Sequence, residues 1–322
     1  MRVFVSYIMV SSLTACLMAL IPQLTFLLAI AWGAVIIMSS VYLDRNQVLI
    51  IFAINVLLMY GIAGGSTVFF YLCFFGAAVL VMAFLSTARS DYYRLQKWGL
   101  ITAVVGVSLF MSLIYLSTGE IGMAEMEAQL GSYLENTVQA YEESGVFEIY
   151  EERGISKAEL EERFAEVISL VVWHLPGFYY LQAIMVVFFM LLLTSFLSLK
   201  RNIQRLKKKP YAQEIMPWQL VWLVIAGLGL WLWGKEQANA IYYIGSNILL
   251  VMVPITMYFG LAALIYKLGH NKTARNKLII VLIVVLSIIF PLSALIFLSL
   301  IGLFDSLLDY RKLRLKGEDF PK

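Results

Sequence analysis

The chain has 322 residues, of which 61% are hydrophobic and only 14% are charged, and its formal net charge is +3. Soluble domains carry about 25% charged residues, and the apolar residues here fall into long uncharged runs. This composition excludes a soluble two-domain protein and predicts an all-α fold, a polytopic bundle of transmembrane helices. Cys16 and Cys73 both lie inside apolar runs, which excludes a disulfide framework and a cysteine-based metal site.

The first 42 residues contain one charged residue, Arg2, and are too long for a single membrane crossing. Pro22 predicts a turn that divides them into two spans, which we interpret as retained helices rather than a signal peptide. A glycine-rich outer turn, Gly61–Ser66, is expected between the third and fourth spans. The next three predicted spans are Val48–Tyr60, Thr67–Leu85 and Gly99–Leu116.

Residues 117–166 form the sizeable water-soluble segment of the chain. They hold thirteen of the sixteen glutamates and three basic residues. Apolar residues at near-helical spacing predict an amphipathic helix over about residues 124–143. A second helix is predicted to begin at Ser156, which can cap the N–H of Glu159 while Glu159 reaches back in a capping box.

The sixth span, Val167–Leu199, contains no charged residue and leads into a basic cluster over residues 200–209. Pro176, near its outer end, is expected to kink or restart the helix. Basic residues that flank a span stay in the cytoplasm, so this helix predicts the orientation of the whole protein.

The remaining sequence predicts a seventh span beginning at Pro217 and an eighth over about Asn239–Tyr266. The uncharged stretch Leu278–Leu303 is broken at Pro291. Two short helices meeting there would form a hairpin and return the basic tail to the cytoplasm. This interpretation gives about ten spans, whereas one continuous helix would give nine.

The predicted topology places twenty of the 24 lysines and arginines on the inner side. It predicts a protein of the cell membrane with both termini cytoplasmic. The predicted divisions are five transmembrane helices in residues 1–116, the acidic extracytoplasmic segment 117–166, five transmembrane helices in 167–310, and a basic cytoplasmic tail, 311–322. The inner basic clusters fit anionic lipid headgroups, and no nucleic-acid partner is expected.

The sequence offers no catalytic constellation. It contains no phosphate-binding loop with its lysine, no His-Glu-x-x-His and no Cys–His metal spacing. The predicted membrane spans also lack the central ionisable residues that a proton-coupled pump needs. We therefore expect no enzyme activity, no cofactor and no metal, and assign no catalytic residue.

Two amides inside apolar spans, Asn55 and Asn247, are the candidate ligand-binding groups. Asn247 follows Tyr242, Tyr243 and Gly245, and an amide in hydrocarbon must bond to another helix or face a cavity. One interpretation is therefore an interhelical hydrogen bond beside a close glycine contact, and the other is a polar anchor in a ligand pocket.

Pro176, Asp305 and Arg311 are candidates for a structural or gating role. Asp305 lies at the inner end of the last span, near Arg311. A local ion pair, interfacial snorkelling and a gate are the alternatives considered for this carboxylate.

Several features of the C-terminal half occur in an order that resembles a known family. The features are the acidic helix pair before Pro176, the basic linker, Pro217-Trp218, Gly245-x-Asn247, Gly260-Leu261-Ala262, Gly302-Leu303-Phe304-Asp305 and Tyr310-Arg311. In this order they resemble the YybS-like family of bacterial multi-pass membrane proteins of unknown function, over essentially the whole chain and most firmly from Glu159 to Arg314. That family has been compared, at the level of fold, with substrate-binding subunits of vitamin transporters and with MreD-like cell-shape proteins.

Two functional hypotheses follow. The first is a small-molecule binding or transport protein that borrows energy from a partner subunit. The alternative is a non-transporting membrane scaffold that docks cell-envelope or cytoplasmic partners. A closed polar pocket near Asn247 would favour the first hypothesis and a solid core the second. The partners considered are the lipid bilayer, a small-molecule ligand, and a protein partner or energising subunit.

Overall fold

The computed structural model describes residues 2–118, 131–132, 138–139, 144, 156–236, 239–269 and 289–313. It consists of two compact units, Met1–Lys208 and Lys209–Lys322. Every regular element in the described ranges is a helix, which confirms the all-α prediction for that part of the chain. Most of the acidic segment lies outside these ranges; of the predicted helix over 124–143, only residues 131–132 and 138–139 are described, and these are helical.

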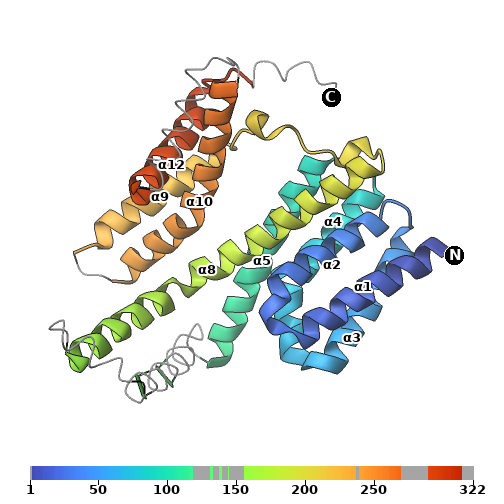
Figure 1. The fold of residues 1–322 in the computed structure, drawn as a ribbon, viewed down its shortest axis with the longest axis horizontal. Coiled ribbons are helices and arrows are strands. Elements are labelled where there is room, and N and C mark those ends of the chain that lie inside the picture. The colour runs from blue at the N-terminus through green and yellow to red at the C-terminus, as the bar shows by residue number, and fades with distance from the viewer. Residues whose placement is uncertain are drawn as a thin grey trace. The chain divides into compact units, whose positions relative to one another are not determined.

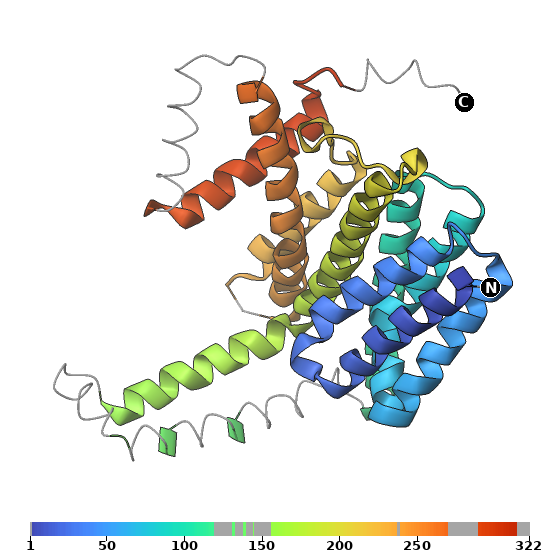
Figure 2. The same cartoon turned by 45° about the vertical axis from the view of Figure 1, so that its right-hand side comes forward.

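The N-terminal unit is a bundle of apolar helices (Figures 1 and 2). Its helices are α1 (Arg2–Leu20), α2 (Thr25–Ser39), α3 (Arg45–Tyr71), α4 (Ala77–Thr87), α5 (Tyr92–Thr118) and α8 (Lys157–Lys200). A short 3-10 turn, η1 (Pro22–Leu24), separates α1 from α2, and the two helices pack against each other. The predicted break at Pro22 is therefore confirmed.

The helix α3 begins with a complete capping box. The Asp44 carboxylate accepts from the Gln47 N–H at 2.8 Å, and the Gln47 side chain accepts from the Asp44 N–H at 3.3 Å. This reciprocal pair satisfies two backbone donors at the exposed helix start.

The turn expected over Gly61–Ser66 is present as a sharp bend at one residue, with helix on both sides of it. Gly64 adopts φ 81° and ψ 175°, a conformation that only glycine reaches without strain. The chain bends there and continues into a π-helix, η2 (Leu72–Gly76), where Gly76 lies beside Phe52 of the first half of α3. Arg45 and Phe84 are in contact, so the chain folds back at Gly64, and the predicted break between the third and fourth spans is confirmed at a single residue.

The helix α8 begins at the predicted cap, with Ser156 Oγ accepting from the Glu159 N–H at 3.2 Å, which confirms the Ser156 half of the capping box. Glu159 forms an ion pair with Arg163 one turn later, at 2.7 Å. The helix continues through Pro176 to Lys200, so the expected restart does not occur. The helix α8 packs against both α2 and α5.

The interior of the N-terminal unit is filled by aromatic and aliphatic side chains. Trp32, Phe74 and Phe75 are among its largest fully buried side chains. The helix α5 approaches η2 so closely that a Cβ at Gly106 would overlap the Cys73 carbonyl. These contacts make the described part of this unit a packed core.

In the C-terminal unit, α10 (Ala240–Gly269) packs against both α9 (Gln219–Gly234) and α12 (Pro291–Leu308) (Figure 2). A Cβ at Gly302 would overlap the Thr256 carbonyl, and one at Gly260 the Leu298 carbonyl. Glycines on both helices therefore allow the α10 and α12 backbones to touch. The start of α12 at Pro291 confirms the predicted break there.

Seven stretches in the described residues are long and apolar enough to cross a membrane. One of them, Arg45–Thr87, has 43 residues, and a straight helix of that length would span about 65 Å, roughly twice a bilayer core. The Gly64 kink divides it. The shorter apolar helix α9 has 16 residues, and the first arm of the predicted C-terminal hairpin lies outside the described ranges. The count of ten spans stays a prediction.

Candidate functional site

A buried polar cluster lies at one end of the C-terminal unit. Its charged centre is Asp305 in the last turn of α12 and Arg311 just beyond it, with side chains only 3% and 4% exposed. The guanidinium binds both carboxylate oxygens: Nη2 donates to Oδ2 at 2.6 Å, and Nε is 3.1 Å from each oxygen. The ion pair that was one of the sequence alternatives for Asp305 is therefore present.

The local backbone explains how Arg311 reaches back to the helix. Asp309 adopts a left-handed conformation, φ 44° and ψ 50°, and its N–H donates to the Asp305 carbonyl at 2.9 Å. This end of α12 reverses the chain direction within two residues.

Arg311 also fixes the segment that precedes α9. Its Nη1 donates to the Ala212 carbonyl at 2.5 Å, and its Nη2 donates to the Glu214 carbonyl at 2.6 Å. Ser306, in the same turn as Asp305, donates to the Met216 carbonyl at 2.9 Å. Side chains at the end of α12 and just beyond it therefore donate to backbone carbonyls of the segment before α9, which lies outside any α-helix.

The Glu214 side chain belongs to the same cluster. It is 6% exposed, and Tyr258 of α10 donates its hydroxyl proton to Glu214 Oε2 at 2.6 Å. Tyr211, in the 3-10 turn η4 (Tyr211–Gln213), donates in turn to the Tyr258 carbonyl at 2.7 Å. Burial and then the negative charge of Glu214 raise the pKa of Tyr211 to about 12, so Tyr211 remains a donor at physiological pH.

The side chains of the cluster bond to one another and to the backbone of the segment before α9. Both carboxylates accept from donors that come from other elements or other turns, and Arg311 spreads its donors over four oxygens. Within the described residues, no three His, Cys, Asp or Glu side chains converge as a metal site.

The predicted group around Asn247 lies on α10. Asn247 is half-buried, and its Nδ2 donates to the Tyr243 carbonyl one turn earlier at 2.7 Å. Gly245 lies against α9, where a Cβ would overlap the Trp231 backbone, and the Tyr242 ring lies 6.3 Å from the Trp231 ring. The close glycine contact of the structural interpretation is present.

Asn55 belongs to the N-terminal unit and is completely buried between three helices. Its Oδ1 accepts from Trp32 Nε1 of α2 at 3.3 Å. Its Nδ2 donates to Ser11 Oγ of α1 at 3.0 Å and to the Ile51 carbonyl at 2.5 Å. The amide therefore connects helices, and it lies in a different unit from Asn247.

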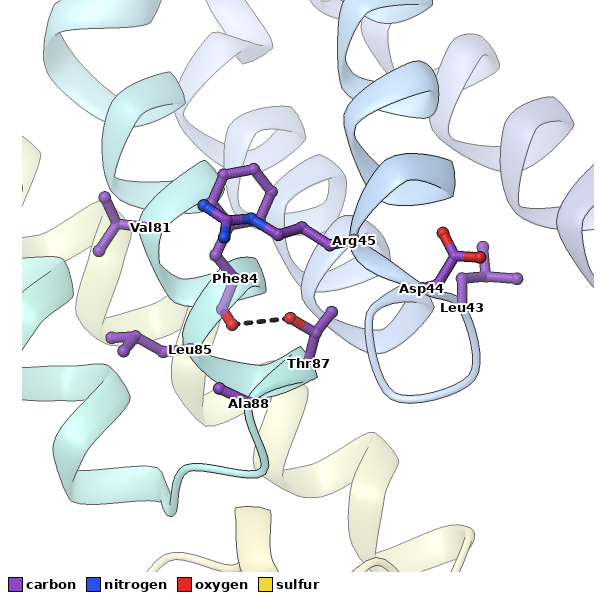
Figure 3. Close-up of a pocket in the computed structure, with 8 residues that line it drawn as sticks. All are labelled: Leu43, Asp44, Arg45, Val81, Phe84, Leu85, Thr87 and Ala88. Carbon is purple, nitrogen blue, oxygen red and sulfur yellow. Dashed lines mark hydrogen bonds between the residues drawn. The ribbon is translucent and has the colours of Figure 1, made fainter.

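A pocket of about 670 Å³ opens at the basic end of the N-terminal unit (Figure 3). It lies between the start of α3 and the end of α4. Its lining residues are Leu43, Asp44, Arg45, Val81, Phe84, Leu85, Thr87 and Ala88.

Sequence reasoning missed Glu214, Tyr211 and Tyr258. Glu214 stands alone as an acid after a run of lysines, which is the one signal that could have marked it. Its partner Tyr258 is 44 residues away, in the middle of an apolar stretch, and only the folded chain brings them together.

One family model matches residues 9–306, nearly the whole chain, and its description is "Predicted membrane protein (DUF2232)". No curated protein and no solved structure is detectably similar to the chain. The matched range covers all the described helices from the first turns of α1 to the carboxylate of Asp305 in α12. The long apolar helices are those expected of a membrane protein, in agreement with this match, and the chain belongs to the DUF2232 family of membrane proteins.

Proposed function

We propose that the protein is a non-enzymatic scaffold of the bacterial cell membrane, a YybS-like protein that docks a partner at its basic end. Both termini and the basic linker 200–209 are cytoplasmic in this proposal, and residues 117–166 are extracytoplasmic. The role resembles that suggested for MreD-like proteins more than that of a transporter subunit.

The use of the candidate ligand groups in helix packing is the observation that supports this proposal. Asn55 directs both polar atoms of its amide to α1, α2 and its own helix. Gly245 accommodates the backbone of α9. A transported solute needs polar groups that converge on a cavity, whereas Asn55 bonds to helices of its own unit and Gly245 packs against α9 of the other unit.

The basic linker offers the docking surface. Arg205 donates to the Ser86 carbonyl at the end of α4 at 2.6 Å, and the Lys208 N–H donates to Ser195 Oγ of α8 at 3.0 Å. These bonds hold the linker backbone, while Lys200 and Lys207 remain exposed. A fixed row of cations favours an acidic partner segment, because little ordering entropy is lost when it binds.

Cysteine labelling tests the orientation. In a variant with Cys16 and Cys73 replaced by alanine, a cysteine at Gly145 should react with an impermeant thiol reagent in intact cells. One at the exposed Gln204 should not. The reverse pattern would overturn the proposed topology.

Site-specific photo-cross-linking tests the docking role. A photoreactive residue at Lys207 should give a discrete protein adduct, and one at Lys235, after α9, should not. Removing the charges of Lys200, Arg201 and Lys209 should abolish the adduct, because the surface then loses its cations. Equal adducts from both positions, or none from Lys207, would contradict the proposal.

Small-molecule transport is the second candidate, and one observation favours it. Tyr243, Ser246 and Asn247 are only half-buried on α10. If they anchor a solute, native mass spectrometry of the purified protein should find a retained small molecule that Asn247→Leu removes. For the scaffold, we expect no bound solute.

A further inference from the structure

We propose that the pocket between α3 and α4 binds the phosphate headgroup of an anionic phospholipid, with Arg45 as the phosphate-binding residue. The pocket volume of about 670 Å³ lies in the usual range for small-molecule sites, about 300–1,000 Å³. This site goes beyond the docking role proposed above, and the residues that line it lie outside the basic linker.

The pocket has one cationic residue and apolar walls. The Arg45 guanidinium lies over the Phe84 ring, 4.2 Å from its centroid (Figure 3). Among the described residues its side chain has no carboxylate partner. Val81, Phe84 and Leu85 supply the apolar surface, which suits the first carbons of acyl chains.

The neighbouring carboxylate does not neutralise Arg45. Asp44 is committed to the capping box, where it accepts from the Gln47 N–H. In Figure 3 its carboxylate lies away from the Phe84 ring that the guanidinium covers. The donors of Arg45 are therefore available to a ligand anion.

Two further cations flank the α4 wall. Arg89 follows Ala88, the last lining residue, and Arg205 donates to the Ser86 carbonyl at 2.6 Å. Burial, and then the positive charge of Arg89, lower the pKa of Arg205, so the two guanidinium groups lie close enough to repel each other. A phosphate nearby would relieve this repulsion.

The location fits a lipid rather than a solute. The ends of α3, α4 and α8 that meet here carry the basic residues, and Arg201 of the linker lies 5.7 Å from the Tyr42 ring. Basic pockets between transmembrane helices on the cytoplasmic side are sites where anionic headgroups bind. Apolar walls beside the guanidinium would be of no use to free inorganic phosphate.

The test titrates delipidated full-length protein in detergent with phosphatidylglycerol, with phosphatidylcholine and with inorganic phosphate, and follows the melting temperature and native mass. We expect phosphatidylglycerol to bind and to raise the melting temperature. Arg45→Gln should weaken this binding by about fivefold or more, as expected for one basic side chain at an anionic lipid. Ala88→Trp, which keeps every charge but fills the exposed rim of the pocket, should weaken it too.

Arg94→Gln is the matched control, because Arg94 is exposed at the start of α5 and does not line the pocket. Its phosphatidylglycerol binding should stay within about twofold of the parent protein, since it loses only long-range attraction. An equal loss in Arg94→Gln, or unchanged binding in both Arg45→Gln and Ala88→Trp, would overturn the site. A full response to inorganic phosphate alone would overturn the assignment to lipid.

Discussion

The N-terminal unit completely buries a neutral amide, Asn55, whereas the C-terminal unit buries the charged pair Asp305–Arg311. The amide lies within a stretch, residues 46–88, that contains no Asp, Glu, Lys or Arg. The charged pair lies at the very end of α12, where the chain leaves the apolar helix.

The difference follows from the cost of desolvation. A neutral amide needs only two or three partners to be tolerated in hydrocarbon, and three helices supply them to Asn55. A buried ion requires a counter-charge and several further hydrogen bonds. Arg311 finds these further bonds in the Ala212 and Glu214 carbonyls, which lie in the segment before α9 and outside any α-helix. A buried charged pair is therefore favoured at the end of a helix, where backbone carbonyls can accept hydrogen bonds from it.

Removing the charge at Arg311 should break the C-terminal cluster and have the largest effect. Arg311→Met leaves the Asp305 carboxylate and two carbonyls without their donor, which should cost about 3–5 kcal/mol. Thermal unfolding in detergent measures this, with Lys312→Met at the exposed next position as the control. Adding Asp305→Leu should recover part of the loss, and no recovery would contradict a coupled ion pair.

Glycine contacts should be the next most sensitive feature. Gly302→Ala forces a Cβ into the Thr256 carbonyl and should destabilise the C-terminal unit by about 1–3 kcal/mol. Gly229→Ala on α9 points into open space and should be neutral or stabilising, because alanine favours helix. Equal melting temperatures for the two variants would show that α10 and α12 are not in backbone contact.

Asn55→Leu and Asn247→Leu compare amides of the two units directly. The first leaves Trp32 Nε1 without its buried acceptor and should cost about 1–2 kcal/mol. The second removes the bond to the Tyr243 carbonyl among the contacts of Asn247 and should cost about 0.6 kcal/mol. A larger loss from Asn247→Leu than from Asn55→Leu would contradict this order.

The smallest effect should be the alkaline response of Tyr211. Its folded pKa of about 12 exceeds the unfolded value of about 10, so the folded state retains the proton over this interval. The stabilisation is complete below about pH 10 and declines as pH rises toward 12. Tyr211→Phe should flatten the pH dependence of melting in that window, and Tyr310→Phe, at an exposed position, should not. If the melting temperature depends on pH identically in both variants, groups other than Tyr211 cause the loss of stability at alkaline pH.

The apolar helices, and several residues at which they begin or break, could be predicted from the sequence. Hydrophobic length predicted the helices, and the breaks at Pro22 and Pro291 followed from the missing proline N–H. Ser156 as the start of α8 followed from its capping side chain. These features are local, because each depends on residues within one or two turns.

Long-range packing decided the rest. The sequence predicted a break within Gly61–Ser66 but not that it would fall on Gly64 alone with helix on both sides, because glycine permits both a loop and a sharp bend. Nor could it show that Pro176 stays inside one helix, since the missing proline N–H permits either a continuous or an interrupted helix. Glu214 was missed because a carboxylate becomes buried only when a tyrosine 44 residues away and the end of α12 close over it.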